Sequence, residues 1–288
     1  MKIFNSIIVY LFIIVIFNIS YISSYTSDID PESKKTVISN LRYIRTLHVQ
    51  DYNGPEVKNP KLSIVIPIYN GEDYVVPLVC SIQLQTLKEI EILFVDDHSE
   101  DSTYDKILDA QEKESRIRVI RNKKNRGIMY SRMYGALQTK GKYVTFIDSD
   151  DLYINSNVLE NAYNTAVAKK LDLIQYEYVG STFDGDETYD YLLAYLSKAK
   201  YNEIVRKPNV KYLLFGQKDS PGGSGIVYDK LYSRKVITNM ADFLGEDLIH
   251  IHLIFMEDFL ISFAAFRSAE NYMLMKSFGV WHWNKNPN

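Results

Sequence analysis

Residues 62–69 read LSIVIPIY, an apolar run typical of a strand buried on both faces of a parallel sheet. Two further runs of this kind follow, EILFV at 91–95 and KYVTFI at 142–147. Further strands are predicted at 117–120 and 173–179, and helices at 72–86, 102–113, 128–139 and 156–170. Pro77 is expected to kink the first of these helices. Because strands and helices alternate, the sequence predicts an α/β fold with an open, mostly parallel sheet flanked by helices.

Acidic residues follow two of these predicted strands. Asp96 and Asp97 come directly after the run at 91–95, and Asp148, Asp150 and Asp151 come after the run at 142–147. Ligands of open α/β sheets bind at the carboxyl ends of the strands. Carboxylates spaced two apart can share one Mg²⁺ or Mn²⁺ ion with a substrate phosphate. The alternative is that one of these aspartates only caps the helix that follows.

Four motifs together resemble family 2 glycosyltransferases, which are inverting, DxD-containing enzymes of the GT-A fold. They are SIVIPIYN (63–70), FVDDHSEDST (94–103), NRGIMYSRMYGA (125–136) and GKYVTFIDSDD (141–151). The resemblance implies one glycosyltransferase domain over 61–288. Residues 61–180 would form its nucleotide-sugar-binding half, and residues 181–288 its acceptor-binding half.

The resemblance also implies roles for residues that would bind the donor, a nucleotide-sugar. Pro67, Tyr69 and Glu72 would line the nucleotide pocket. Asp96 and Asp97 resemble the acidic pair that reads the base and ribose, usually of a uridine nucleotide. The donor implied is therefore a UDP-sugar.

The DxD motif would supply the metal site. Asp148 and Asp150 match the motif that holds Mn²⁺ or Mg²⁺ on the donor diphosphate, and Asp151 is close enough to replace either. Arg132 would face the donor phosphates, although its two neighbours depart from the family pattern. His282 resembles a late histidine that completes the metal site in some GT-A enzymes; a packed aromatic-flanked histidine is the alternative.

The second half of the chain would contain the catalytic base. FMEDFLIS (255–262) resembles the family element in which Asp258 takes the acceptor proton and Glu257 orients the base or binds acceptor. The alternative is that both acids only favour a helix N-terminus. Lys230, in GIVYDKLYSRKVI (225–237), is expected to be structural, and the tyrosine-rich stretch 189–201 is expected to be a helix.

Two rival functions follow from the same residues. The first is a non-catalytic, membrane-tethered module that binds sugar nucleotides or glycans. The second is a sugar-phosphate nucleotidyltransferase, which would need a basic, glycine-rich loop after the first strand, whereas residues 68–73 are acidic. A further alternative is hydrolysis of the sugar nucleotide, in which water takes the place of the acceptor.

Residues 3–22 carry no charge and are long enough to span a bilayer as a helix. They predict a signal anchor or transmembrane helix over 1–24. A cleaved signal peptide, which would make the protein secreted, and a soluble core helix are the alternatives. Residues 25–60 are expected to form an irregular stem lying against the main domain, and a short amphipathic piece near residues 37–47 is the alternative. A single-pass, type II membrane protein of the secretory pathway (Golgi or ER) would act on a glycan, glycoprotein or glycolipid acceptor.

Composition excludes other classes of protein. The formal net charge is −3 over 288 residues, so no nucleic-acid partner is expected. The one cysteine, Cys80, cannot form an internal disulfide or a thiolate zinc site. The apolar fraction of 46% is typical of a folded globular protein and not of a multi-span membrane protein.

Overall fold

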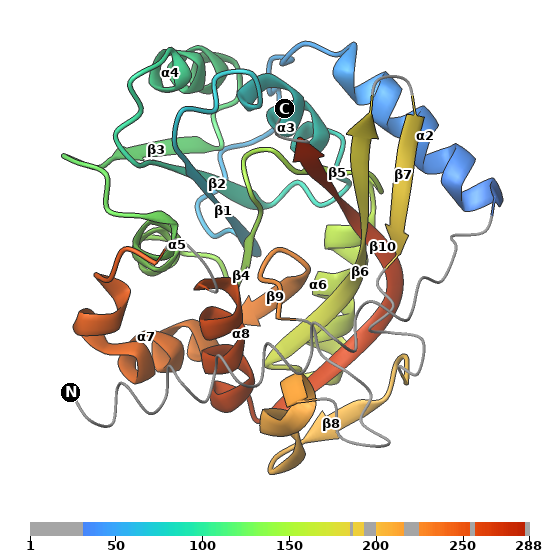
Figure 1. The fold of residues 1–288 in the computed structure, drawn as a ribbon, viewed down its shortest axis with the longest axis vertical. Coiled ribbons are helices and arrows are strands. Elements are labelled where there is room, and N and C mark those ends of the chain that lie inside the picture. The colour runs from blue at the N-terminus through green and yellow to red at the C-terminus, as the bar shows by residue number, and fades with distance from the viewer. Residues whose placement is uncertain (1–30, 185–186, 193–199, 216–224, 254–256, 286–288) are drawn as a thin grey trace.

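The fold is that of a computed structural model, which describes residues 31–184, 187–192, 200–215, 225–253 and 257–285 (Figure 1). Its helices are α2 (Pro31–Arg45), α3 (Val75–Gln83), α4 (Thr103–Lys113), α5 (Ile128–Leu137), α6 (Val158–Lys169), the 3₁₀-helix η2 (Asn209–Phe215), α7 (Arg234–Ile249) and α8 (Glu257–Ser268). Its strands are β1 (Leu62–Ile68), β2 (Ile90–Asp96), β3 (Ile117–Arg121), β4 (Tyr143–Phe146), β5 (Leu152–Tyr153), β6 (Leu173–Asp184), β7 (Glu187–Leu192), β8 (Ile204–Arg206), β9 (Lys230–Ser233) and β10 (Asn271–Lys285).

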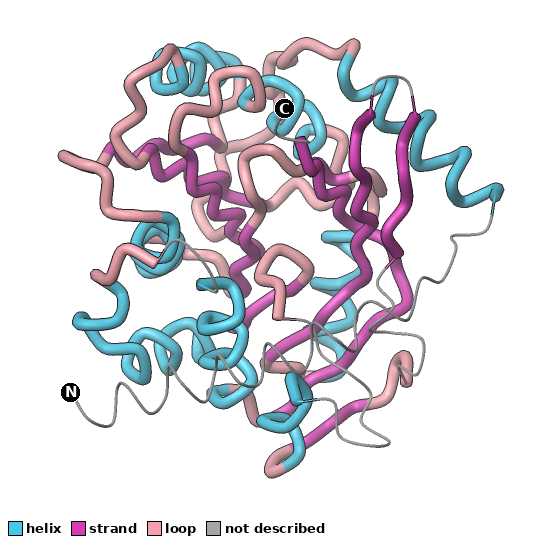
Figure 2. Tube along the Cα trace, viewed as in Figure 1, coloured by secondary structure: helices cyan, strands magenta, loops and turns pink. Residues whose placement is uncertain are grey.

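All the described strands form one sheet, in the order β3-β2-β1-β4-β9-β6-β10-β5, with β7 on β6 and β8 on β10 (Figure 2). Neighbours from β3 to β4 are parallel. The antiparallel strand β9 lies between β4 and β6, so β6 and its parallel partner β10 point the same way as β1 to β4. The predicted α/β fold with a mostly parallel sheet is therefore confirmed.

Each face of the sheet has its own apolar core. In β1, Ile64 and Ile66 belong to one core, whereas Val65, between them, belongs to the other. Side chains of α2, α3, α4 and α6 pack into the first core, and those of α5, α7 and α8 into the second. A strand covered by helices on both faces is apolar at nearly every position, which is why β1 and β2 read as near-continuous apolar runs. The buried exceptions Ser63 and Glu91 satisfy each other, because the Ser63 hydroxyl donates a hydrogen bond to the Glu91 carboxylate at 2.6 Å.

The segment before β1 differs from the irregular stem expected over 25–60. Residues 31–45 form helix α2, which lies beside α3 (Figure 1). Leu41 and Ile44 are buried in the first core, and the Asn40 side chain donates a hydrogen bond to the carbonyl of Ile154. The folded unit thus begins before residue 61, because an apolar stripe at helical spacing attaches α2 to the core.

The predicted anchor over 1–24 lies outside the described residues. Among the helices that the structure does describe, none is both long enough and apolar enough to cross a membrane.

Two local expectations were wrong. Residues 187–192 form strand β7, paired antiparallel with β6, where a helix was expected over 189–201. Threonine and tyrosine favour a strand when a neighbouring strand is available for pairing. Pro77 was expected to kink a helix over 72–86, but α3 begins at Val75, so the proline occupies the first turn, where its missing N–H has no helical partner to lose.

Candidate active site

The loops that follow β1, β2 and β4 meet at one edge of the sheet, because these strands are parallel and adjacent. Pro67 lies in β1, where a proline would normally remove a hydrogen bond of the sheet. The register explains its presence, since β4 pairs with β1 only from Leu62 to Val65. Pro67 therefore lies beyond the end of β4, at the edge where the acidic loops gather.

Hydrogen bonds join the loop after β1 to the loop after β2. The backbone N–H of Gly71 donates to the Thr103 hydroxyl at 2.8 Å, and Glu72 accepts from the N–H of Ser102 at 3.2 Å. The predicted pocket residue Glu72 thus fixes the loop after β2. Tyr69 is 47% exposed, so its ring remains available to a ligand.

Asp96 and Asp97 are both buried, and both hold backbone in place. Asp96 forms an ion pair with Arg121 at 3.1 Å and accepts from the N–H of Ser99. Asp97 accepts from the N–H groups of Arg126 at 2.8 Å and Gly127 at 2.7 Å, immediately before α5. Asp97 therefore sets where α5 begins.

Arg132 of α5 joins the two predicted catalytic elements. Its guanidinium is 1% exposed and donates hydrogen bonds to Asp148, after β4, and to Asp258, in the first turn of α8. Glu257 lies 3.7 Å from the same guanidinium. The sequence suggested that Arg132 faces the donor phosphates, whereas the structure places it between two carboxylates that are 110 residues apart in the chain.

In this cluster, burial and the neighbouring charges have opposing effects on the pKa of Asp258 and on the pKa of Arg132. Burial, together with the carboxylates of Asp148 and Glu257, raises the pKa of Asp258 to about 6, although Arg132 acts to lower it. Burial by itself would lower the pKa of Arg132, but Asp148, Asp258 and Glu257 raise it, so the guanidinium stays charged. Asp258 is thus a carboxylate that can exchange a proton near neutral pH, which is the property a general base needs.

The three aspartates after β4 differ in exposure. Asp148 and Asp150 are half-buried, whereas Asp151 is buried. Within the described residues, no three His, Cys, Asp or Glu side chains lie close enough to hold a metal ion by themselves. Mg²⁺ is commonly held by one or two carboxylates and completed by substrate phosphates. The half-buried carboxylates of Asp148 and Asp150 therefore fit a cation that is shared with a diphosphate.

Strand β10 brings the chain back to this acidic loop. Trp281 pairs with Leu152, the residue directly after Asp151, so the backbone of residue 282 lies near the loop. The side chain of His282 is outside the described part of the structure.

The segment 225–229, which ends just before Lys230, contacts α8 and lies close to the acidic loop. Its Tyr228 is buried, and burial followed by the charges of Asp151 and Asp148 raises the pKa of its phenol. Asp229 and Lys230 form an ion pair at 2.5 Å, with both side chains fully buried. No pattern of residues marks this ion pair, because Asp229 and Lys230 stand at the start of an otherwise ordinary strand.

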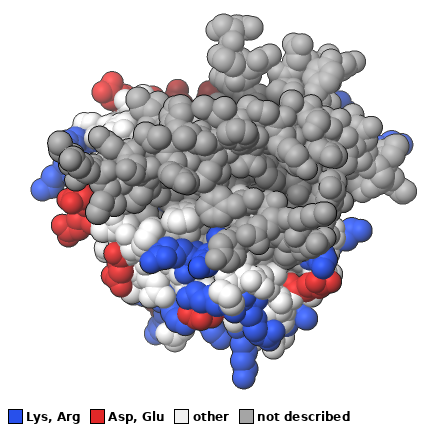
Figure 3. Space-filling view, turned by 60° about the horizontal axis from the view of Figure 1, so that its bottom comes forward, with Lys and Arg blue, Asp and Glu red and all other residues white. Residues whose placement is uncertain are grey.

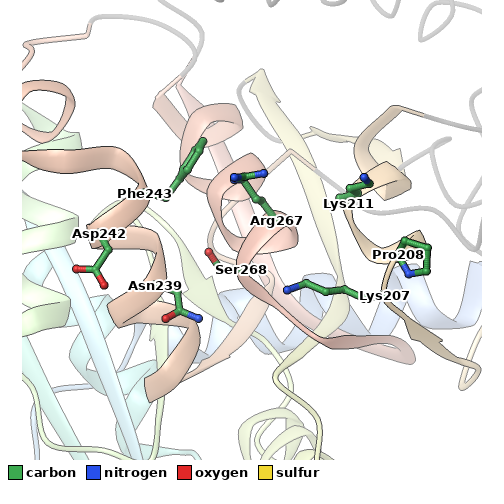
Figure 4. Close-up of a pocket in the computed structure, with 8 residues that line it drawn as sticks. All are labelled: Lys207, Pro208, Lys211, Asn239, Asp242, Phe243, Arg267 and Ser268. Carbon is green, nitrogen blue, oxygen red and sulfur yellow. The ribbon is translucent and has the colours of Figure 1, made fainter.

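A cavity of about 630 Å³ lies at the other end of α8 (Figure 4). It is lined by Lys207, Pro208, Lys211, Asn239, Asp242, Phe243, Arg267 and Ser268. Lys and Arg side chains gather on the described part of the face shown in Figure 3. The cavity lining shares no residue with the cluster around Arg132, so the two are separate features.

The comparisons with known proteins identify the family. The profile of the family described as "Glycosyl transferase family 2" matches residues 63–236, more than half of the chain. The chain belongs to this family.

The proteins to which the chain is similar include the following three. An uncharacterized glycosyltransferase, EpsJ of Bacillus subtilis, is 28% identical over 80% of this chain and 62% of its own length. The glycosyltransferase GlyG of Streptococcus pneumoniae is 34% identical over 44% of this chain and 40% of its own. S. aureus TarS 1–349, solved in complex with UDP-GlcNAc, shares the fold with a TM-score of 0.58 at 21% identity, covering 79% of this chain and 60% of that one. The chain thus spans less than two thirds of each relative.

Proposed function

We propose that this glycosyltransferase moves a sugar from a UDP-sugar to an acceptor hydroxyl with inversion at the anomeric carbon. The observation that carries the proposal is that the guanidinium of Arg132 forms ion pairs with both Asp258 and Asp148. The predicted base and the predicted diphosphate-binding carboxylate are thereby brought to one place from distant parts of the chain. The UDP-GlcNAc bound by TarS supports a uridine diphosphate donor.

The residues suggest how such a transfer would proceed. Asp258 would take the proton of the acceptor hydroxyl, whose oxygen attacks the anomeric carbon as the bond to the diphosphate breaks. Glu257, in the same helical turn, would orient the acceptor. A divalent cation held by Asp148 and Asp150, with Asp151 or His282 as a further ligand, would supply positive charge for the leaving diphosphate. The mechanism needs no enzyme nucleophile.

The first test is release of UDP by the full chain from a panel of UDP-sugars, with and without Mn²⁺. We expect release from one donor that is abolished by a chelator. Asp150→Ala should lower it at least about a hundredfold, because a metal contributes several kcal/mol of charge stabilisation. Asp109→Ala, an exposed aspartate on α4, is the matched control and should leave release unchanged. Equal release in the presence of a chelator would exclude the metal.

We further propose that residues 3–22 anchor the protein in a membrane, with the catalytic domain in the lumen of the secretory pathway. The support is the uncharged apolar run, and the acceptor would then be a glycoprotein or a glycolipid. Membranes carrying the protein should retain it after alkaline carbonate extraction, and protease should digest the domain only after the vesicles are opened. Extraction into the soluble fraction would contradict the anchor.

A further inference from the structure

Residues 225–229, which we term the bridging segment, run between the two predicted catalytic elements. At one end, Gly225 packs so closely on α8 that an added Cβ would lie 3.0 Å from the Phe259 ring, and Phe259 is the neighbour of Asp258. Further along, burial raises the pKa of the Tyr228 phenol, and the nearby negative charges of Asp151 and Asp148 raise it further. The bridging segment thus contacts the helix of the base and lies close to the loop of the DxD motif.

Buried side chains hold the backbone of the bridging segment. The carbonyl of Ile226 accepts from the Lys230 ammonium and, at 3.0 Å, from the Ser262 hydroxyl. The carbonyl of Val227 accepts from the Tyr232 hydroxyl at 2.9 Å, and that of Tyr228 from the Tyr176 hydroxyl at 3.0 Å. Three successive carbonyls are therefore fixed by side chains from β9, α8 and β6.

The Ile226 carbonyl is where the segment is joined to the catalytic helix. Ser262 lies four residues after Asp258 in α8, so the two side chains lie on the same side of the helix. The second donor, Lys230, lies 5.7 Å from the centroid of the Phe266 ring, a further four residues along α8. The orientation of α8 about its axis is thus coupled to the bridging segment at two successive turns.

The buried ion pair costs free energy that simple packing would not require. Lys230 and Asp229 have no exposed surface, and apolar residues of similar size in place of such a pair are often equally stable or more so. An ion pair is justified where it fixes a particular geometry, and here the ammonium reaches both Asp229 and the Ile226 carbonyl.

We propose that Lys230 and Ser262 are positioning residues that, through the Ile226 carbonyl, hold the first turn of α8 and therefore Asp258 in register with the DxD loop. This inference rests on the proposed function, since it assigns Asp258 as the base. The linkage is formed by Ile226, Lys230 and Ser262, none of which is among the residues proposed to bind the donor. Loss of the linkage should therefore impair transfer and leave donor binding intact.

The test uses two variants of the full chain with matched controls. Asp229→Asn/Lys230→Met removes both charges of the pair, so no buried charge is left uncompensated. Ser262→Ala removes one hydroxyl and keeps the helix. Lys235→Met, an exposed lysine on α7, and Ser268→Ala, at the far end of α8, are the controls. Measurements are kcat, the Kd for UDP, and amide hydrogen exchange of residues 257–262.

We expect the double variant to lower kcat about 10- to 100-fold, the range that misplacement of a catalytic group by about 1 Å produces. Ser262→Ala should lower kcat about fivefold, the worth of one hydrogen bond, and Ser262→Thr, which keeps the hydroxyl, should restore it. In both variants the Kd for UDP stays unchanged, and exchange at 257–262 is faster than in the controls.

Two results would overturn the proposal. The first is wild-type kcat and unchanged exchange at 257–262 in folded Ser262→Ala; the second is a loss of UDP affinity that parallels the loss of kcat. Hydrogen exchange does not depend on turnover. If the wild-type chain transfers no sugar, the proposed function fails, whereas the exchange measurement still decides whether the linkage holds α8.

Discussion

Asp258→Asn is expected to lower kcat by about 10²- to 10⁴-fold, the usual contribution of a general base. Asparagine has the shape of aspartate and can still accept the hydrogen bond from Arg132, so the Kd for UDP should remain within a few-fold of wild type. Kinetics of UDP release, together with calorimetry of UDP binding, measure both quantities. Glu257→Gln, in the same turn, is the matched control and should cost much less.

The pH profile gives a second readout of the same prediction. Because the pKa of Asp258 is raised to about 6, the carboxylate form is lost as the pH falls through 6. In the wild type, kcat/KM should therefore fall about tenfold for each pH unit below this value. The limb should be absent from the residual activity of Asp258→Asn. Turnover near the wild-type rate in that variant would remove Asp258 as the base.

Arg132→Met is expected to lower the free energy of unfolding by about 3 kcal/mol near pH 8, because it leaves Asp148, Asp258 and Glu257 without their shared cation. Arg132 acts to lower the pKa of Asp258, so without it this pKa in the folded variant should rise further above that of the unfolded chain. The loss of stability is then largest above this raised pKa and shrinks as Asp258 protonates.

Urea unfolding at pH 5 and at pH 8 measures this difference directly. Arg132→Lys, which keeps a charge but cannot donate to two carboxylates with a planar fork, should fall between Arg132→Met and the wild type. A loss of stability that is the same at both pH values would show that Arg132 acts by packing and not by neutralising the carboxylates.

Elements with local signals could be predicted from the sequence. Strands β1 to β4 and helices α4 to α6 have apolar periodicity of the right length, and the structure places them within a few residues of the predicted ranges. Strand β7 could not be predicted, because whether its two tyrosines and one threonine form a helix or a strand depends on the pairing with β6. Helix α2 was underestimated because its polar face resembles a linker.

The candidate site likewise contains residues that could be predicted from the sequence and residues that could not. The acidic residues after β2 and β4 could be located because strand ends mark them in the sequence. The role of Arg132 could not be predicted, since its partner Asp258 lies 126 positions away and only the packing of α5 against α8 brings them together. The Ile226 carbonyl is a backbone group, and no residue type marks it.

Strand β10 has a consequence for how the protein folds. It pairs with β6 from Tyr272 on Leu173 onward, so about a hundred residues separate the partners in the chain. On a ribosome, β6 would be exposed for several seconds before β10 is synthesised, at about 5–20 residues per second. Over that interval one edge of the long strand β6 is unpaired, which is the condition under which chains associate wrongly. The region of β6 and β10 should therefore be the aggregation-sensitive part of the nascent protein and the part that chaperones protect.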